Sequence, residues 1–303
     1  MYDIRFPHLG ITFHNLKTGF TIFGFEIKFY GLIIGLGFLL AYLWVVHEAK
    51  RTKQDTEIYL DAFLWLVIPA ILGARIYYVL FNAKEYFIKG QGFWATVKGI
   101  ISIRNGGLAI YGGLIAGIIV VIIFARKRKA NILLMLDTAS MGILIGQILG
   151  RWGNFFNREA FGEYTDSFLA MQIPTEFFVG KGSINGLVAN GVITEKMAQN
   201  VVEYNAMQWI SVHPTFLYES LWNLALFIFL FVYRKHKKFD GEMILLYIWG
   251  YGLGRVWIEA LRSDSLMFFD TGMKVSQLLA ALCVLVSSVI IVKKRLDYMR
   301  ENN

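Results

Sequence analysis

The sequence has 303 residues, of which 56% are hydrophobic, 16% are aromatic and only 17% are charged, and its mean hydropathy is +0.51. Soluble domains carry about 45–50% apolar and about 25% charged residues, so this composition excludes an ordinary cytosolic enzyme and indicates a membrane protein. The net charge of +8 lies largely in short loops, and the single cysteine, Cys283, excludes an intrachain disulfide and a metal site built from several cysteines.

A bilayer core about 30 Å thick needs about 20 mainly apolar residues per helix, and seven segments meet this requirement. They cover residues 29–46, 58–81, 107–125, 132–150, 215–233, 243–260 and 275–292. The first 28 residues are charged and lack an early apolar core, so we expect a retained first helix and no cleavable signal peptide. The sequence therefore predicts an all-α polytopic membrane protein with a single membrane domain over residues 1–303.

The distribution of positive charge predicts the orientation. Half of the 30 lysines and arginines lie in four compact clusters, at residues 50–53, 126–129, 234–238 and 293–300, each after an odd-numbered span. Because short loops rich in Lys and Arg stay in the cytoplasm, the N-terminus is predicted outside and the C-terminus in the cytoplasm. Basic clusters can also bind nucleic acid, but their alternation with the spans favours a topological role and no nucleic-acid partner.

Two connections on the predicted outer side are long. Residues 151–212 are polar and contain no spanning run, so we expect an extracytoplasmic head inserted between the fourth and fifth helices. Residues 82–106 contain Phe87, Phe93 and Trp94, and aromatic side chains favour the headgroup level of a bilayer. This second segment is expected to form an interfacial arm between the second and third helices.

Three spans that run from inside to outside carry a Leu-Gly-Arg or Leu-Gly-Ala-Arg element late in their length, with Arg75, Arg151 and Arg255 at its end. At 1.5 Å per residue, Arg75 lies about 9 Å and Arg255 about 7.5 Å inside the span ends. An arginine at a helix centre costs about 2.5–3.5 kcal/mol on insertion scales, so arginines at one depth indicate a cavity or a partner. Snorkelling to the headgroups is the alternative. Since a guanidinium fork matches phosphate oxygens, the predicted ligand is an outer-leaflet phospholipid headgroup.

Further polar residues cluster near these arginines. Four of them, Asn154, Asn157, Arg158 and Glu159, follow the fourth span. His213 lies just before the fifth span, and Glu219 lies near its start. Glu259 and Arg262 share a helix face with Arg255, because they follow at spacings of four and then three residues. A pairing that only neutralises Glu259 is the simplest interpretation of that residue.

Residues 105–114 read Asn-Gly-Gly-Leu-Ala-Ile-Tyr-Gly-Gly-Leu. No strand is expected before them, so they are not a dinucleotide-binding fingerprint, and their glycines suit close contact between helices. Tyr111 in this segment and Tyr30 lie at the outer ends of their spans, where anchoring at the interface is the ordinary explanation.

Residues 150–162, Gly-Arg-Trp-Gly-Asn-Phe-Phe-Asn-Arg-Glu-Ala-Phe-Gly, resemble the signature of the bacterial phosphatidylglycerol–prolipoprotein diacylglyceryl transferases. The resemblance extends through Tyr30-Gly31-Leu32, Gly73-Ala74-Arg75, Gly112-Gly113-Leu114, Asp137, His213-Pro214 to Glu219, and Gly252 to Arg262. It covers nearly the whole chain.

The resemblance implies a seven-helix enzyme of the bacterial inner membrane that needs no cofactor and no metal, with its active site facing the extracytoplasmic side. Such an enzyme moves the diacylglyceryl group of phosphatidylglycerol to the thiol of the lipobox cysteine in a prolipoprotein signal peptide. A thioether forms and glycerol 1-phosphate leaves. The resemblance also implies that Arg151 and Arg255 are essential, and the other family site positions match Tyr30, Asn154, Asn157, Glu159 and Gly162.

One position departs from the family pattern. Many members have a histidine where Tyr111 stands before Gly112-Gly113-Leu114, and a phenol is a weaker base near neutrality than an imidazole. Tyr111 is therefore expected to donate a hydrogen bond or to position the substrate.

The expected mechanism places the phosphate between Arg151 and Arg255, where arginine donors stabilise the charge that grows on the leaving group. Asn154 and Asn157 would orient the glycerol, and Glu159, His213 or the positive field of the arginines would assist removal of the thiol proton. The remaining residues expected to bind substrate are Arg75, Glu219, Glu259 and Arg262.

Two other functions fit parts of the pattern. A lipid-binding transporter or flippase would use the same arginines without making a bond, but no inverted repeat joins two matched halves of the sequence. An intramembrane serine protease would need a Gly-x-Ser-x-Gly element within a span, and the sequence has none.

Overall fold

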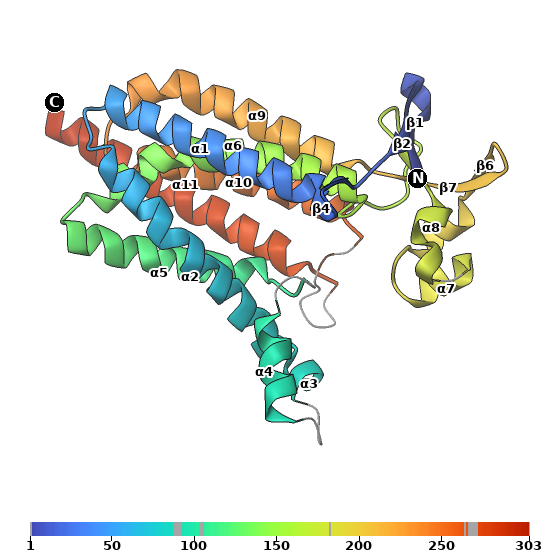
Figure 1. Ribbon diagram of the computed structural model, residues 1–303. Coiled ribbons are helices and arrows are strands. Elements are labelled where there is room, and N and C mark those ends of the chain that lie inside the picture. The colour runs from blue at the N-terminus through green and yellow to red at the C-terminus, as the bar shows by residue number, and fades with distance from the viewer. Residues whose placement is uncertain are drawn as a thin grey trace. The chain divides into compact units, whose positions relative to one another are not determined.

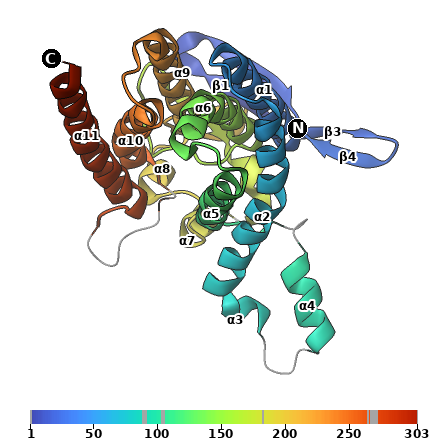
Figure 2. The same ribbon diagram turned by 90° about the vertical axis from the view of Figure 1, so that its left-hand side faces the viewer.

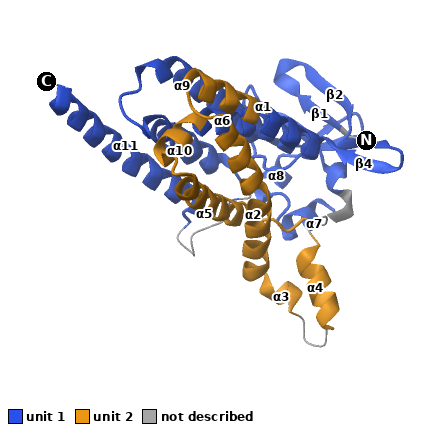
Figure 3. Ribbon diagram, turned by 60° about the vertical axis from the view of Figure 1, so that its left-hand side comes forward, with its two compact units in different colours: residues 1–41, 139–303 blue, residues 42–138 orange. Residues whose placement is uncertain are grey.

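The computed structural model describes residues 2–87, 92–102, 106–181, 183–263, 265 and 272–302. Figure 1 labels its helices and strands in chain order. The chain divides into two compact units, one made of residues 1–41 and 139–303 and the other of residues 42–138, which Figure 3 shows in different colours.

All seven predicted spans are helices. They are α1 (Phe29–Arg51), α2 (Glu57–Phe81), α5 (Ile110–Arg128), α6 (Ile132–Asn157), α9 (Thr215–Tyr233), α10 (Glu242–Leu261) and α11 (Val275–Asn302). Six of them are long and apolar enough to cross a membrane, so the chain is a mostly helical, polytopic membrane protein. The remaining helix, α10, is less apolar than the other six, because it combines glycines and tyrosines with the charged Arg255 and Glu259.

Several helix ends differ from the prediction. Helices α1 and α11 run on to Arg51 and Asn302, past the expected residues 46 and 292, and two other differences bear on the predicted motifs. The third span was expected from Gly107, but α5 begins at Ile110, because Gly106 and Gly107 have φ values of 89° and 77° that a right-handed helix cannot contain. The fourth span was expected to end at residue 150, but α6 continues to Asn157 before Arg158 takes the left-handed conformation, with a φ of 51°. The signature motif therefore begins on a helix rather than in a loop.

The prediction of an all-α fold is wrong for the part of unit 1 outside the helices. An antiparallel five-stranded sheet has the order β2-β1-β5-β7-β6. Its strands are β1 (Tyr2–Phe6), β2 (Ile11–Leu16), β5 (Met171–Pro174), β6 (Val202–Tyr204) and β7 (Met207–Val212). A separate hairpin, visible in Figure 2, joins β3 (Gly19–Ile22) to β4 (Phe25–Lys28). The strands have only three to six residues, so a search for long apolar runs does not detect them.

The head is built from two distant parts of the sequence. Strand β1 pairs with β5 at Arg5 and Gln172, so residues before the first span complete a sheet formed mainly by residues 171–212. The predicted head at residues 151–212 therefore shares its sheet with the N-terminus and starts after α6 ends. Short helices α7 (Ile184–Ala189) and α8 (Glu195–Gln199) and the 3-10 segments η1 (Pro7–Leu9) and η2 (Thr175–Lys181) complete it.

One hydrophobic core joins the head to the helices. Ile4, Ile173 and Ile210 of the sheet are fully buried and cluster with Phe155 near the end of α6 and Phe216 at the start of α9. Burying a large aliphatic side chain contributes about 1.5–3 kcal/mol. The ends of α6 and α9 are thus held by the same core that folds the sheet, and these ends carry the polar motifs.

Glycines allow close packing of the helices in unit 1. A Cβ atom at Gly252 of α10 would lie 2.9 Å from Val284 Cγ2 of α11, and one at Gly153 of α6 would lie 2.8 Å from Tyr30 Cδ2 of α1. Real Cβ atoms do not approach so closely. The glycines therefore let α10 meet α11, and α6 meet α1, at distances that any side chain would increase.

Unit 2 is built around a pair of helices. A Cβ atom at Gly73 of α2 would lie 2.7 Å from the carbonyl oxygen of Gly112 in α5, so these glycines allow backbone contact. The predicted arm contains α3 (Ala83–Tyr86) and α4 (Phe93–Ile101), on which Phe93 and Trp94 are exposed, as expected for the arm. Residues 88–91 and 103–105 of the arm and of the glycine-rich segment lie outside the described residues. A short 3-10 segment, η3 (Arg234–His236), follows α9 in unit 1.

Candidate active site

The centre of the candidate site is the carboxylate of Glu219, in the second turn of α9. Only 2% of this residue is exposed. An isolated carboxylate at such a position would be very costly, so it needs charged or hydrogen-bonding partners. Three other polar side chains supply them, from α6 and α10.

Arg151 of α6 and Arg255 of α10 bind opposite oxygens of this carboxylate. Arg151 Nη2 lies 2.6 Å from Glu219 Oε1, and Arg255 Nη1 lies 3.0 Å from Glu219 Oε2. The two arginines that the sequence analysis singled out are therefore brought together, although 104 residues of sequence separate them. Arg151 is the more open of the two, with 22% of its side chain exposed against 14% for Arg255.

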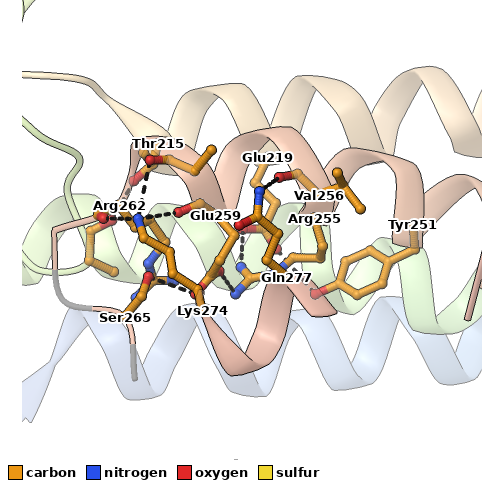
Figure 4. Close-up of polar contacts among 12 residues, drawn as sticks. Thr215, Glu219, Tyr251, Arg255, Val256, Glu259, Arg262, Ser265, Lys274 and Gln277 are labelled. Carbon is orange, nitrogen blue, oxygen red and sulfur yellow. Dashed lines mark hydrogen bonds and ion pairs between the residues drawn. The ribbon is translucent and has the colours of Figure 1, made fainter. Parts of the chain in front are cut away.

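Arg255 is held from a second side. Its Nη2 forms an ion pair with Glu259, one turn further along α10, and Ser265 Oγ donates to the other oxygen of Glu259 at 2.7 Å. Figure 4 shows this row, from Tyr251 through Arg255 and Glu259, on one face of the helix. Arg255 therefore pairs with Glu259 and neutralises it, as the simplest interpretation of the spacing predicted.

Tyr251 is a site residue that the sequence analysis missed. Its hydroxyl donates to Glu219 Oε1 at 3.3 Å, and its ring stacks on Tyr247, with centroids 5.8 Å apart. The signal was present in the sequence, because Tyr251 precedes Arg255 by four residues and so shares its helix face.

The signature motif forms a second polar group next to Arg151. Arg151 Nη1 contacts Asn154 Oδ1 at 3.5 Å, and Asn154 Nδ2 donates to Glu159 Oε1 at 2.9 Å. Asn157 Nδ2 donates to the same oxygen at 3.3 Å. This chain of contacts links the exposed carboxylate of Glu159 to the partly buried arginine pair.

Tyr30 borders the same end of α6. Its ring lies against the bare backbone of Gly153, where a Cβ atom would be only 2.8 Å from Tyr30 Cδ2, and 38% of the residue is exposed. Gly153 stands between Arg151 and Asn154 in the sequence, so Tyr30 lies beside the polar group rather than in the apolar part of the bundle.

The end of the signature is joined to the end of α10. Gly162 and Arg262 form an antiparallel bridge, and the backbone N–H of Glu163 donates to the carbonyl of Leu261 at 2.7 Å. Gly162 N–H donates to the carbonyl of His213 at 2.9 Å. Lys274 Nζ donates to the carbonyls of Glu259 and Arg262 at the C-terminal end of α10, as Figure 4 shows.

His213 lies next to this junction, before α9. Its Nδ1 is 3.3 Å from the hydroxyl of Tyr218. Burial, together with the positive charge of Lys196, lowers the pKa of His213 below its ordinary value of 6.5, against an opposite effect of Glu163. The imidazole is therefore neutral at pH 7.

Arg75 and Tyr111 belong to unit 2. The guanidinium of Arg75 donates to the backbone carbonyls of Gly99, Ile100, Gly106 and Gly107 at 2.7–2.9 Å, and only 6% of the residue is exposed. These bonds hold the end of α4 and the segment before α5, both in the C-terminal part of the arm, against α2. The ring of Tyr111 lies 6.5 Å from that of Tyr77.

The arrangement in unit 1 holds two partly exposed guanidinium groups close together, where an anion could contact both. The two guanidinium charges are balanced by two buried carboxylates, which lowers the cost of holding the four groups inside the helices. Preorganised donors of this kind stabilise charge that develops during a reaction without reorganising. Among the residues that the structure describes, no group of three or more His, Cys, Asp and Glu residues could hold a metal ion.

Comparison with known proteins connects this geometry to a family. A family model described as "Prolipoprotein diacylglyceryl transferase" matches residues 17–293. The chain is 38% identical over 273 residues to a phosphatidylglycerol–prolipoprotein diacylglyceryl transferase of Listeria welshimeri, covering 89% of this chain and 87% of the relative. It is 36% identical to such a transferase of Clostridium perfringens, covering 91% of this chain and 93% of the relative. For the Clostridioides difficile enzyme the identity is 35%, covering 94% and 99%.

Proposed function

Since the chain belongs to the prolipoprotein diacylglyceryl transferase family, we propose that its paired arginines bind the phosphate of phosphatidylglycerol during transfer of the diacylglyceryl group to a prolipoprotein. The acceptor is the thiol of the lipobox cysteine in the signal peptide. The products are a thioether and glycerol 1-phosphate. The observation that carries the proposal is the convergence of Arg151 and Arg255 on one buried carboxylate.

The reaction makes one bond and breaks one bond at the same carbon. The thiolate sulfur attacks the glycerol carbon of the diacylglyceryl group, and the bond from that carbon to the phosphate oxygen breaks. The electron pair stays on the departing glycerol phosphate, so negative charge grows there. Guanidinium donors aimed at this oxygen lower the barrier, and removing one such donor typically costs about 100- to 1,000-fold in rate.

Arg151 makes the first contact with the lipid phosphate, because its side chain is the more exposed of the pair. Glu219 holds both guanidinium groups at a fixed separation before the lipid arrives. Tyr251 and Glu259 maintain that geometry from α10. Asn154, Asn157 and Tyr30 orient the glycerol carbon that is attacked.

Glu159 receives the proton of the incoming thiol. It is exposed, so a cysteine that arrives from outside the bundle can reach it, and Asn154 links it to Arg151. His213, Gly162 and Arg262 position the end of α10 and the start of α9 around the substrate. Arg75 shapes the base of the arm, and Tyr111 donates a hydrogen bond from the start of α5.

The chain spans the bacterial inner membrane seven times, with α10 as the sixth span. The basic residues that follow α1, α5, α9 and α11 face the cytoplasm. The N-terminal strands, the head and the arginine pair then face the extracytoplasmic side, where phosphatidylglycerol of the outer leaflet and the signal peptide meet.

A reconstituted reaction tests the function. Purified protein, phosphatidylglycerol vesicles and a lipobox peptide should give a diacylglyceryl mass increase on the peptide cysteine and an equal amount of released glycerol phosphate. Arg151→Gln should lower the rate at least about 100-fold while membrane insertion is unchanged. Lipid redistribution without a covalent product would instead indicate a transporter, and full activity of Arg151→Gln would remove its assigned role.

A further inference from the structure

A second layer of polar residues lies one helical turn from the arginine pair, on the side away from the head. Gln147 of α6 precedes Arg151 by four residues, and Tyr247 of α10 precedes Tyr251 by four. Asn223 of α9 follows Glu219 by four, and α9 runs in the opposite direction. Residues four apart share a helix face. Gln147, Asn223 and Tyr247 therefore lie on the same helix faces as Arg151, Glu219 and Tyr251.

Contacts within the layer confirm part of this placement. Gln147 Nε2 donates to the hydroxyl of Tyr247 at 2.8 Å, which joins α6 to α10 one turn from the joint made by Arg151, Glu219 and Tyr251. The stacked rings of Tyr247 and Tyr251 connect the two layers.

Asn223 is the unexplained member of the layer. It is fully buried, and neither its amide nitrogen nor its amide oxygen has a hydrogen-bond partner among the described residues. The amide oxygen of Gln147 is also buried and has no hydrogen-bond partner among the residues that the structure describes. Unpaired buried amides are expensive in a membrane interior, so an occupant with both donors and acceptors is expected beside them.

We propose that Asn223, Gln147 and Tyr247 form a subsite for the terminal diol of the phosphatidylglycerol headgroup. The proposal rests on the proposed function, because it takes the lipid phosphate to lie at Arg151 and Arg255. One helical turn is about 5.4 Å, comparable to the reach of a three-carbon glycerol chain beyond its phosphate. Each hydroxyl of the diol both donates and accepts, which matches the unpartnered amide nitrogen and oxygen of Asn223 and the unpartnered amide oxygen of Gln147.

The charge of the layer supports a neutral ligand. None of its three side chains carries a formal charge, whereas the layer above contains two arginines and two glutamates. The ammonium group of another lipid headgroup would find no carboxylate partner among these three side chains. The upper layer thus recognises the phosphate, and the lower layer distinguishes glycerol from other headgroups.

The test compares two lipids that give the same product. Phosphatidylglycerol and phosphatidylpropanol both transfer a diacylglyceryl group, but the propanol headgroup lacks both hydroxyls of the diol. Purified protein in mixed micelles should use phosphatidylglycerol with a kcat/KM about 10- to 100-fold higher. Asn223→Leu, which keeps the branched shape and the number of side-chain heavy atoms and removes the amide, should reduce this ratio to about 1- to 3-fold, and Gln147→Leu should reduce it in the same direction.

A matched control separates recognition from folding. Leu226→Ala removes a buried side chain from the same helix, less than one turn beyond Asn223, and should lower the rates with both lipids while leaving their ratio unchanged. A wild-type ratio near one would overturn the subsite. So would a wild-type ratio that Asn223→Leu leaves intact, since the layer would then hold only water. Absence of any thioether with either lipid would instead refute the proposed function.

Discussion

Glu219 carries its carboxylate into the helix bundle and binds two arginines there, so each of the three charges depends on the others. A buried pair contributes little when compared with apolar packing, but removing one partner leaves an uncompensated charge. The same residue that organises the site is therefore also a point of structural weakness.

Replacement of Glu219 tests this dependence. Glu219→Ala should lower the free energy of unfolding by about 3–5 kcal/mol and abolish lipid transfer, because two guanidinium groups lose their shared partner. Unfolding in detergent and the peptide-modification assay measure the two effects. Glu195→Gln, on the exposed surface of α8, should change neither. Unaltered stability of Glu219→Ala would show that the arginines do not need the carboxylate.

His213 gives stability a pH dependence with a defined sign. Burial and Lys196 lower its pKa in the folded chain below 6.5, so the unfolded chain binds more protons once the pH falls below about 6.5. The contribution of neutral His213 to the free energy of unfolding is fully present above pH 6.5 and is lost as the pH falls toward the pKa of the folded chain. Thermal unfolding of the wild type should therefore show lower stability at pH 5.5 than at pH 7.5, and His213→Gln should reduce the difference. An equal pH dependence in both proteins would exclude His213 as its source.

At the scale of elements, the junction of the signature with the end of α10 depends on a glycine. A Cβ atom at Gly162 would lie 2.7 Å from the carbonyl oxygen of Leu261 and 2.7 Å from Cβ of His213. A backbone carbonyl cannot move aside as the tip of a side chain can. The bridge between Gly162 and Arg262 therefore requires a residue without a side chain.

Gly162→Ala should lower the free energy of unfolding by about 1–3 kcal/mol and reduce transfer, because the added methyl group forces the two segments apart. Gly146→Ala on α6 is the matched control, since a Cβ atom there meets nothing within 4 Å. The control should be neutral or stabilising by up to about 1 kcal/mol, because alanine favours helix more than glycine does. Equal effects of the two substitutions would show that the junction tolerates a side chain.

At the scale of the whole molecule, the helices must satisfy two demands that conflict. They must be apolar enough for the bilayer, yet they must hold four charged groups at one end and a neutral polar layer below them. The conflict is greatest in α10, which carries both Arg255 and Glu259 and is the one predicted span that does not meet the apolar criterion of the other six. The proposed membrane crossing by α10 would therefore depend on its packing against α9 and α11.

Cysteine labelling tests the seven-span topology. In a Cys283→Ala background, single cysteines are placed before and after α10 and in loops that the proposal assigns to each side. A membrane-impermeant maleimide added to intact spheroplasts should label Asn190→Cys and Ser263→Cys, and should label Lys127→Cys and Asp240→Cys only after permeabilisation. Labelling of residues 240 and 263 from the same side would contradict a crossing by α10.

The sequence by itself predicted the seven helices, because runs of about 20 apolar residues form helices in a membrane whatever their neighbours are. It also singled out Arg151 and Arg255, since charges are costly in such runs, and its signature motif indicated the family that the comparisons confirm. It did not predict the sheet, whose short strands come from both ends of the first 212 residues and become strands only by pairing with each other. The role of Glu219 as the common partner of two arginines, and the unpaired amide of Asn223 below it, were likewise decided only by tertiary structure. Such contacts depend on which helix faces meet, and helical spacing within one segment determines a face but not its neighbour.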